Sequence, residues 1–359
     1  MDRFHIHGTL LPGSEPQDFW VVDGRITFIE VEGAQTLATD AFVLPGLVDA
    51  HCHVGLGLEG AVDDATAREQ AATDLASGVM LIRDCGSPAD TRFLQDDPTM
   101  PRLLRAGRHI ARSRRYIRYA AVEVEPEQLV GTVRDEARSG NGWVKLVGDW
   151  IERGVGDLAP SFPAEVAAEA IAVAHEEGAR VTAHCFGEQA VTELVDAGVD
   201  CIEHGTGLDD ATIARMAERG VALVPTMINL DNFPTYAAQG AAKFPTYSAH
   251  MLDLHARRHA TIGAAFDAGV PIYAGTDAGT VVAHGRIVDE IAELARIGGA
   301  EFALGAASWR ARRWLSADSL GEGASADLIV CSEDPRENID TLRSPGQLIL
   351  RGAILGSDV

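Results

Sequence analysis

The middle of the chain alternates short apolar segments with segments of helical periodicity, and this alternation limits the fold more than any other feature. The apolar segments have the length and composition of strands and lie at 47–53, 79–85, 108–113, 143–148, 180–185, 199–204, 221–226 and 270–277. Helical patterns lie between them, and the one at 163–178 begins with Pro and ends with Gly, as helices commonly do. Eight strand–helix units over about 270 residues predict an α/β fold, the (β/α)8 TIM barrel. An open, doubly wound sheet would also alternate, but usually with fewer units.

The two chain ends have a different pattern, in which apolar and polar residues alternate around turns. This period of two is typical of short antiparallel strands, and it runs through residues 1–40 and again through 323–355. Neither end is long enough to cover the face of a sheet alone. We therefore expect residues 1–43 and 320–359 to pair as one small β-sandwich domain. Residues 44–319 then form the TIM-barrel catalytic domain.

The charge and the cysteine content exclude several classes of protein. The chain of 359 residues has a formal net charge of −23, so nucleic acids and anionic membrane surfaces would be repelled. No apolar run approaches the roughly 18–20 residues that span a bilayer, and the first residues lack the features of a secretory signal. The five cysteines are scattered without a CxxC pair, which argues against a disulfide framework or a cysteine zinc site. We expect a cytoplasmic protein.

Residue types that bind metals stand where the predicted strands end. The active sites of TIM barrels form at the carboxyl ends of the strands, and the polar residues there are His51, His53, Asp84, Lys145, His184, His204 and Asp277. His51 and His53 are two positions apart on one strand, so their side chains share a face and can bind one cation. This spacing is weak evidence by itself, because His5 and His7 repeat it in the terminal strands.

The shared position of the other strand-end residues favours a functional role for them. His184 or His204 alone would more often be structural, but both end successive strands just before a turn that contains glycine. Asp277 is either a helix N-cap or a general base beside a metal-bound water. Lys145 either extends to the barrel rim or, near two cations, is a neutral amine that reacts with carbon dioxide to form a bridging carbamate. Asp84 fits a rim position better than a ligand position.

Seven segments together resemble one family. They are LPGLVDAHCH, LIRDCG, WVKLVG, RVTAHCFGEQAV, GVDCIEHGT, AGTDAG and LGEGASADLIV, spread over about residues 40–355. In combination they resemble the metal-dependent amidohydrolase superfamily, in its imidazolonepropionase-like and prolidase-like branch. The resemblance implies two divalent metal ions, with zinc the expected metal, and the ligands His51, His53, Lys145, His184, His204 and Asp277.

The same resemblance implies a role for each ligand. His51 and His53 would hold the more buried metal, with Asp277 completing its shell. Carboxylated Lys145 would bridge to the second metal, which the two later histidines would hold. Asp277 would also take the proton of the bridging water and later protonate the leaving amine.

One segment departs from the family pattern and bears on the substrate. Members of this branch often carry Gly-Gly-His at the end of the third strand, where the His reaches the substrate carbonyl, whereas the matching stretch here reads Arg114-Arg115-Tyr116. We expect Tyr116 to donate that hydrogen bond instead. An arginine is expected to bind a substrate carboxylate bidentately. On an extended strand this is Arg114, which shares the face of Tyr116, and Arg115 can take its place only if the chain turns there. His284 is expected either to line the mouth of the pocket or to have a structural role in its loop.

We therefore predict an enzyme that hydrolyses an amide or peptide-like C–N bond of a small, carboxylate-bearing substrate, such as a dipeptide or an N-acyl amino acid. The first alternative is a mononuclear deaminase or cyclic-amide hydrolase in which Lys145 is not carboxylated, and the next is a barrel that binds without turnover. A nicotinamide-dependent oxidoreductase is the most distant alternative, because the GxGxxG at 55–60 lies in a loop and leaves the strand-end residues unexplained. The expected partner is a small-molecule substrate, and a homo-oligomer is compatible with the sequence.

Overall fold

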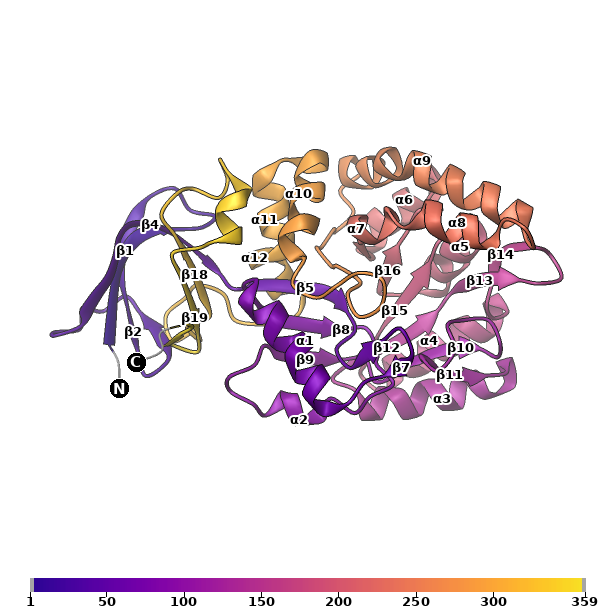
Figure 1. The fold of residues 1–359 in the computed structure, drawn as a ribbon, viewed down its shortest axis with the longest axis horizontal. Coiled ribbons are helices and arrows are strands. Elements are labelled where there is room, and N and C mark those ends of the chain that lie inside the picture. The colour runs from indigo at the N-terminus through magenta and orange to yellow at the C-terminus, as the bar shows by residue number, and fades with distance from the viewer. Residues whose placement is uncertain (1–2, 357–359) are drawn as a thin grey trace.

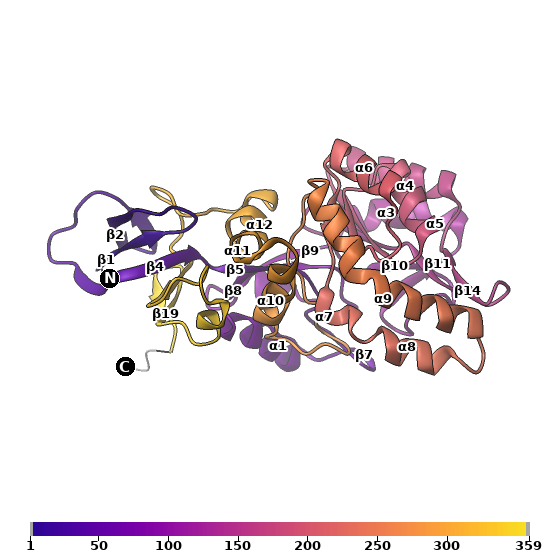
Figure 2. The ribbon, with the colours of Figure 1, turned by 90° about the horizontal axis from the view of Figure 1, so that it is seen from above.

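The computed structural model describes residues 3–356, in two parts that lie next to each other along the long axis (Figures 1 and 2). The strands are β1 Arg3–Leu10, β2 Pro16–Val22, β3 Arg25–Thr27, β4 Gln35–Pro45, β5 Leu47–Cys52, β6 Leu56–Gly57, β7 Gly60–Ala61, β8 Val79–Asp84, β9 Arg102–Arg105, β10 His109–Arg112, β11 Ala121–Val124, β12 Trp143–Val147, β13 Asp149–Glu152, β14 Asp157–Pro160, β15 Arg180–Cys185, β16 Cys201–His204, β17 Ala222–Val224, β18 Leu328–Cys331, β19 Gln347–Leu350 and β20 Ala353–Ile354. The helices are α1 Asp64–Ala76, α2 Arg92–Gln95, α3 Pro126–Ser139, α4 Ala164–Glu176, α5 Glu188–Ala197, α6 Asp210–Arg219, α7 Met227–Leu230, α8 Phe233–Gly240, α9 Pro245–Asp267, α10 Ile287–Gly298, α11 Ala300–Ala307 and α12 Trp309–Trp314, with a 3-10 helix at Ile339–Arg343.

A ring of parallel strands forms the larger part. On one side β5, β8 and β9 pair in that order, and on the other side β10, β12, β15, β16 and β17 do. β9 and β10 are consecutive pieces of one strand position, since β9 pairs with β8 and β10 with β12. The segment 271–277 closes the ring, because the Leu223 amide donates to the Pro271 carbonyl and the Asp277 amide to the His51 carbonyl. The ring thus has the eight positions of the predicted strands.

The eighth position is not the regular strand that the sequence predicts. Only isolated bridges and single backbone hydrogen bonds join residues 270–277 to β17 and β5. Pro271 has no amide hydrogen to donate, and the amide of Thr276 donates to the Asp49 side chain at 3.1 Å. These two residues cannot supply the donors that a regular ladder requires.

Both chain ends contribute to one seven-stranded sheet, in the order β20-β19-β18-β4-β1-β2-β3. Its indigo and yellow strands lie together at one end of the molecule (Figure 1). The sheet is continuous, whereas we expected the two stacked sheets of a sandwich, and it curls until Arg25 of the edge strand β3 bridges Ser325. Its own apolar core includes the fully buried Ile6, Phe19 and Ile349.

Helices cover the outside of the ring (Figure 2). In α4, Ala167, Ala170, Ile171 and Ala174 are buried at the i, i+3, i+4, i+7 spacing of an amphipathic helix, and this confirms the helix predicted within 163–178. Among residues 3–356 no helix is both long enough and apolar enough to cross a membrane.

Candidate active site

The six predicted metal ligands meet at one end of the ring. His51, His184 and His204 occupy the last or next-to-last positions of β5, β15 and β16, Lys145 is the central residue of β12, and His53 and Asp277 come just after strand positions. All are buried except Asp277, whose side chain is 18% exposed. Parallel strands bring their carboxyl ends to one edge, which explains why residues so distant in sequence converge.

Three of these residues form a tight set at the centre. His51 Nε2 and His53 Nε2 are 3.2 Å apart, and Asp277 Oδ1 is 3.0 Å and 3.1 Å from them. A tetrahedral zinc ion with bonds of about 2.0–2.1 Å holds its ligand atoms ~3.3 Å apart. His53 Nδ1 donates to the Gly86 carbonyl at 2.8 Å, which leaves its Nε2 without a hydrogen. The three atoms therefore fit the coordination shell of one divalent metal.

His184 and His204 form a second set beside the first. His184 Nδ1 and His204 Nε2 are 3.0 Å apart, and the ring of His204 lies 5.4 Å from that of His51. Thr226 Oγ1 lies 2.7 Å from His204 Nδ1 and fixes that ring. Burial lowers the pKa of His204 to about 3 and holds the pKa of His184 well below its usual range. Both rings are neutral, which is the form that binds a metal.

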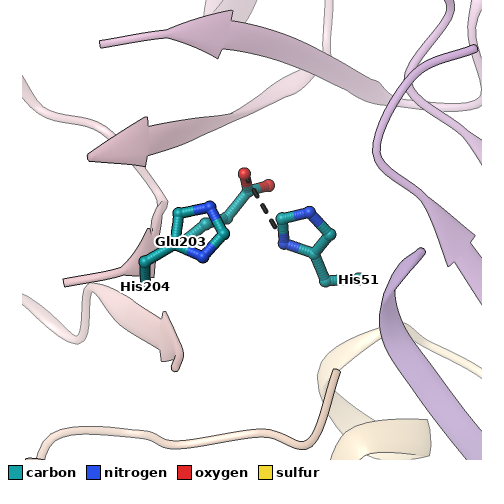
Figure 3. Close-up of side chains that lie close together, drawn as sticks. All are labelled: His51, Glu203 and His204. Carbon is teal, nitrogen blue, oxygen red and sulfur yellow. Dashed lines mark ion pairs between the residues drawn. The ribbon is translucent and has the colours of Figure 1, made fainter. Parts of the chain in front are cut away.

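Glu203 lies between the two sets, and the sequence reasoning missed it. Its carboxylate points into the space between the rings of His51 and His204 (Figure 3), with Oε2 3.6 Å from His51 Nδ1. Lys145 Nζ donates to the same oxygen. Burial would lower the pKa of Lys145, but the charge of Glu203 outweighs it and raises that pKa. Lys145 is therefore paired here as an ammonium ion, whereas the sequence argument invoked its neutral amine.

Left-handed backbone conformations explain why Glu203 was missed. Adjacent residues on a strand normally point to opposite faces, so His204 facing the centre predicts Glu203 facing away. His204, however, has a φ of 65°, and Thr226 and Asp277 have φ values of 50° and 59°. Such conformations are uncommon for residues other than glycine and cost free energy. At the end of β16 this conformation lets two consecutive side chains reach the same centre.

Asp277 is held from two sides. Its Oδ1 faces His51 and His53, while Asn229 Nδ2 donates to its Oδ2 at 2.7 Å. The Tyr236 hydroxyl in turn donates to Asn229 Oδ1 at 3.0 Å. Burial would raise the pKa of Asp277, but the charge and hydrogen bond of His51 outweigh it and hold that pKa well below its usual range. Asp277 is therefore a carboxylate with both oxygens fixed, and α7 and α8 supply the residues that orient it.

Replacing Asn229 with alanine should lower kcat about 10–100-fold, the range typical of lost outer-shell partners. The Asp277 carboxylate loses a hydrogen bond that stabilises its charged form, so its pKa should rise and the acidic limb of the kcat–pH profile should move to higher pH. The measurement is kcat against pH for wild type, Asn229→Ala and Tyr236→Phe. Tyr236→Phe removes only the next link and should show a smaller shift. A lower kcat with an unmoved pH profile would contradict this orienting role.

A cavity of 430 Å³ opens above these residues, with His53, His184 and Asp277 among those that line it. Six aromatic side chains are among the residues that line it: Tyr116, Trp150, Phe186, Tyr236, Phe244 and Tyr247. Leu58 and Val281 line it nearer the surface and are 73% and 52% exposed. A cavity of this size accepts a small molecule, and its walls favour one with a large apolar group.

His109 is a second residue that the sequence reasoning missed. It lines the cavity, its ring stacks 4.7 Å from that of His53, and the ring of Tyr116 lies 5.6 Å away. The sequence signal was the stretch Gly107-Arg108-His109, which differs from Gly-Gly-His by one residue. This stretch is closer to the family pattern than residues 114–116, and both His109 and Tyr116 line the cavity.

Of the four residues predicted to contact the substrate, only one lines the cavity. Tyr116 lines the cavity, but Arg114, Arg115 and His284 do not. Arg114 has a φ of 62° and is exposed, because the chain turns there and the strand alternation ends. The guanidinium of Arg115 donates to the carbonyls of Trp150, Ala159 and Pro160 at 2.8–3.0 Å.

His284 has a structural partner instead of a place in the pocket. Its Nδ1 lies 2.7 Å from Asp74 Oδ2, and the amide of Gly285 donates to the other oxygen of the same carboxylate. These contacts tie the loop after Asp277 to α1. Of the two roles expected for His284, these contacts support the structural one. The two arginines lie outside the cavity and are not placed to bind a substrate carboxylate there.

Comparisons with known proteins agree with this geometry. The model of the amidohydrolase family matches residues 42–352. An uncharacterized protein of Mycobacterium tuberculosis is 55% identical over 99% of this chain and 96% of its own length. Among solved structures, a Xaa-Pro dipeptidase with methionine bound in its active site has a TM-score of 0.83 at 23% identity, covering 98% of this chain and 99% of that one. Aspergillus niger ochratoxinase has a TM-score of 0.79 at 20% identity, covering 98% and 95%.

The chain belongs to the amidohydrolase family, whose members generally use divalent metals, and its structural neighbours include prolidase-like enzymes. It is a hydrolytic enzyme that acts on C–N bonds of small molecules, and its larger part has the TIM-barrel type of fold. The nicotinamide alternative is thereby excluded. The glycine-rich segment 55–60 instead forms the antiparallel hairpin of β6 and β7.

Proposed function

We propose that the enzyme hydrolyses the amide bond of an N-acyl amino acid or a dipeptide with the help of two divalent cations, with zinc as the metal. The observation that carries the proposal is the convergence of His51, His53 and Asp277 at the floor of an aromatic cavity, with atoms 3.0–3.2 Å apart. His184 and His204 would hold the second ion, and Lys145, carboxylated, would bridge the two. The name of the Xaa-Pro dipeptidase neighbour supports a dipeptide-like substrate.

The residues divide the chemistry among them. A bound divalent ion would lower the pKa of a water molecule and polarise the amide carbonyl. Asp277 takes the proton of the attacking water, and its carboxylate is ready for this because its pKa lies well below neutral pH. It then returns the proton to the leaving amine. Asn229 keeps Asp277 oriented, and His109 and Tyr116 stand on the cavity wall where a substrate carbonyl can accept a hydrogen bond.

The five cysteines fit a protein of a reducing compartment, and we propose the cytoplasm. All five are free and buried. Burial raises the pKa of the thiols of Cys52, Cys85 and Cys185 well above their usual range, so they remain protonated. Unreactive thiols of this kind need no oxidised partner.

A second candidate is a mononuclear deaminase or cyclic-amide hydrolase on the same ring. The ion pair between Lys145 and Glu203 favours it, because an ammonium group cannot react with carbon dioxide to form the bridging ligand. The set of His51, His53 and Asp277 would then be the complete protein shell of one metal.

Metal content separates the two candidates. We expect about two zinc ions per chain by elemental analysis of enzyme reconstituted with zinc and bicarbonate, together with amide hydrolysis in a screen of N-acyl amino acids, dipeptides and cyclic ureas. One ion per chain with turnover of cyclic ureas alone would support the mononuclear candidate. A reconstituted enzyme with no bound metal would contradict both.

A further inference from the structure

The aromatic cavity has one lysine at its mouth. Only two of the 30 Lys and Arg residues of the chain are lysines, Lys145 and Lys243. Both belong to this site, since Lys145 lies at the centre of the ring and Lys243 lines the cavity. Lys243 stands in the turn between α8 and α9 with its side chain exposed, and its Nζ is 5.2 Å from the centre of the Phe244 ring. The second lysine is therefore placed where a substrate enters.

Lys243 differs from neighbouring cations because it has no counterion among residues 3–356. On the adjoining helix α9, Arg257 pairs with Asp253 at 3.1 Å and Arg258 with Asp231 at 3.0 Å. No ion pair within the described part of the chain includes Lys243, although the chain has 53 acidic residues. A net charge of −23 repels anions at a distance, so an anionic ligand needs a local positive charge at the mouth.

We propose that Lys243 binds the carboxylate of the substrate, and that the aromatic wall beside it takes a large apolar group. The preferred substrates are then N-acyl amino acids or dipeptides with apolar side chains, with the amide lying deeper in the cavity near Asp277. This specificity role rests on the amide hydrolysis proposed above. It assigns to Lys243 the contact that the sequence argument assigned to Arg114 or Arg115, which the structure places outside the cavity.

The test measures binding without turnover. N-benzoyl-phenylalanine and its methyl ester are titrated into zinc-loaded Asp277→Asn enzyme, with and without Lys243→Gln, by isothermal titration calorimetry. Lys243→Gln should weaken binding of the acid about tenfold, the size of one charge-assisted contact, and leave binding of the ester unchanged. Lys243→Arg keeps the charge and should retain most of the affinity for the acid.

Arg114→Gln is the matched control, because Arg114 is an exposed cation outside the cavity. It should leave both affinities unchanged. Equal losses for acid and ester in Lys243→Gln, no loss in either, or the same loss in Arg114→Gln would overturn the role of Lys243. Hydrolysis of the acid by wild-type enzyme is measured in parallel. If the wild-type enzyme does not hydrolyse the acid, the proposed amide hydrolysis is wrong. The role of Lys243 is tested separately, by the affinities of the variants for acid and ester.

Discussion

Replacing Asp277 with asparagine should lower kcat by about 10²–10⁴-fold, the range typical of lost general-base catalysis. Asparagine keeps the shape of the side chain and can still accept a hydrogen bond from Asn229, but it cannot take the proton of the attacking water. The measurement is kcat for the best amide substrate of the screen. A variant within a few-fold of wild-type turnover would mean that the base lies elsewhere.

Two further measurements separate loss of the base from loss of structure or metal. Asp277→Asn should keep its thermal unfolding midpoint close to that of wild type, because the strands and the other ligands are unchanged. Its zinc content is measured as well, because Asp277 is itself one of the three proposed ligands and a loss of zinc would lower turnover without a lost base. As a matched control, Asp231→Asn changes an exposed carboxylate that pairs with Arg258 and does not line the cavity. Its turnover should be that of wild type.

Replacing Lys145 with alanine should remove the second metal and lower kcat by more than the roughly 100-fold expected for outer-shell changes. In the proposed site the bridging ligand would form by attack of the free amine of Lys145 on carbon dioxide, which creates an N–C bond and releases one proton. Alanine cannot form it. Short carboxylic acids with bicarbonate should restore part of the activity and of the second metal, because a free carboxylate can take the bridging position.

The partner of Lys145 calls for a second variant. Glu203 is fully buried, and removing only Lys145 takes away the cation nearest to its carboxylate, leaving the Thr182 hydroxyl at 2.7 Å and the more distant Arg83 at 3.8 Å. Breaking such a buried pair costs up to about 3–5 kcal/mol of stability. The double variant Lys145→Ala/Glu203→Gln removes both charges and should fold with less loss. If either folded variant keeps two metals per chain and the full rate, Lys145 is not the bridge. If it keeps one metal and the full rate, the mononuclear candidate is correct.

Local patterns were enough to predict the strand–helix order and the residue types at the strand ends. An apolar strand that must be buried on both faces leaves few places for His, Lys or Asp, so these residues stand out in the segments around His51, Lys145 and His204. Their common position at the carboxyl ends then follows from the parallel ring. This is why the convergence of the six predicted ligands could be expected from local patterns alone.

The residues that complete the site depend on contacts between distant elements. Glu203 was not predicted because strand alternation places its side chain on the face opposite that of His204. The left-handed backbone of His204 at the end of β16 ends this alternation. Asn229 lies in α7 and Lys243 in the turn between α8 and α9, and no local pattern predicts how this segment after β17 packs over the cavity. Arg114 was predicted for an extended strand and Arg115 for a chain that turns there; the chain turns at Arg114, but neither side chain lines the cavity. Periodicity describes residues within one regular element, and these contacts form where elements end or where distant elements meet.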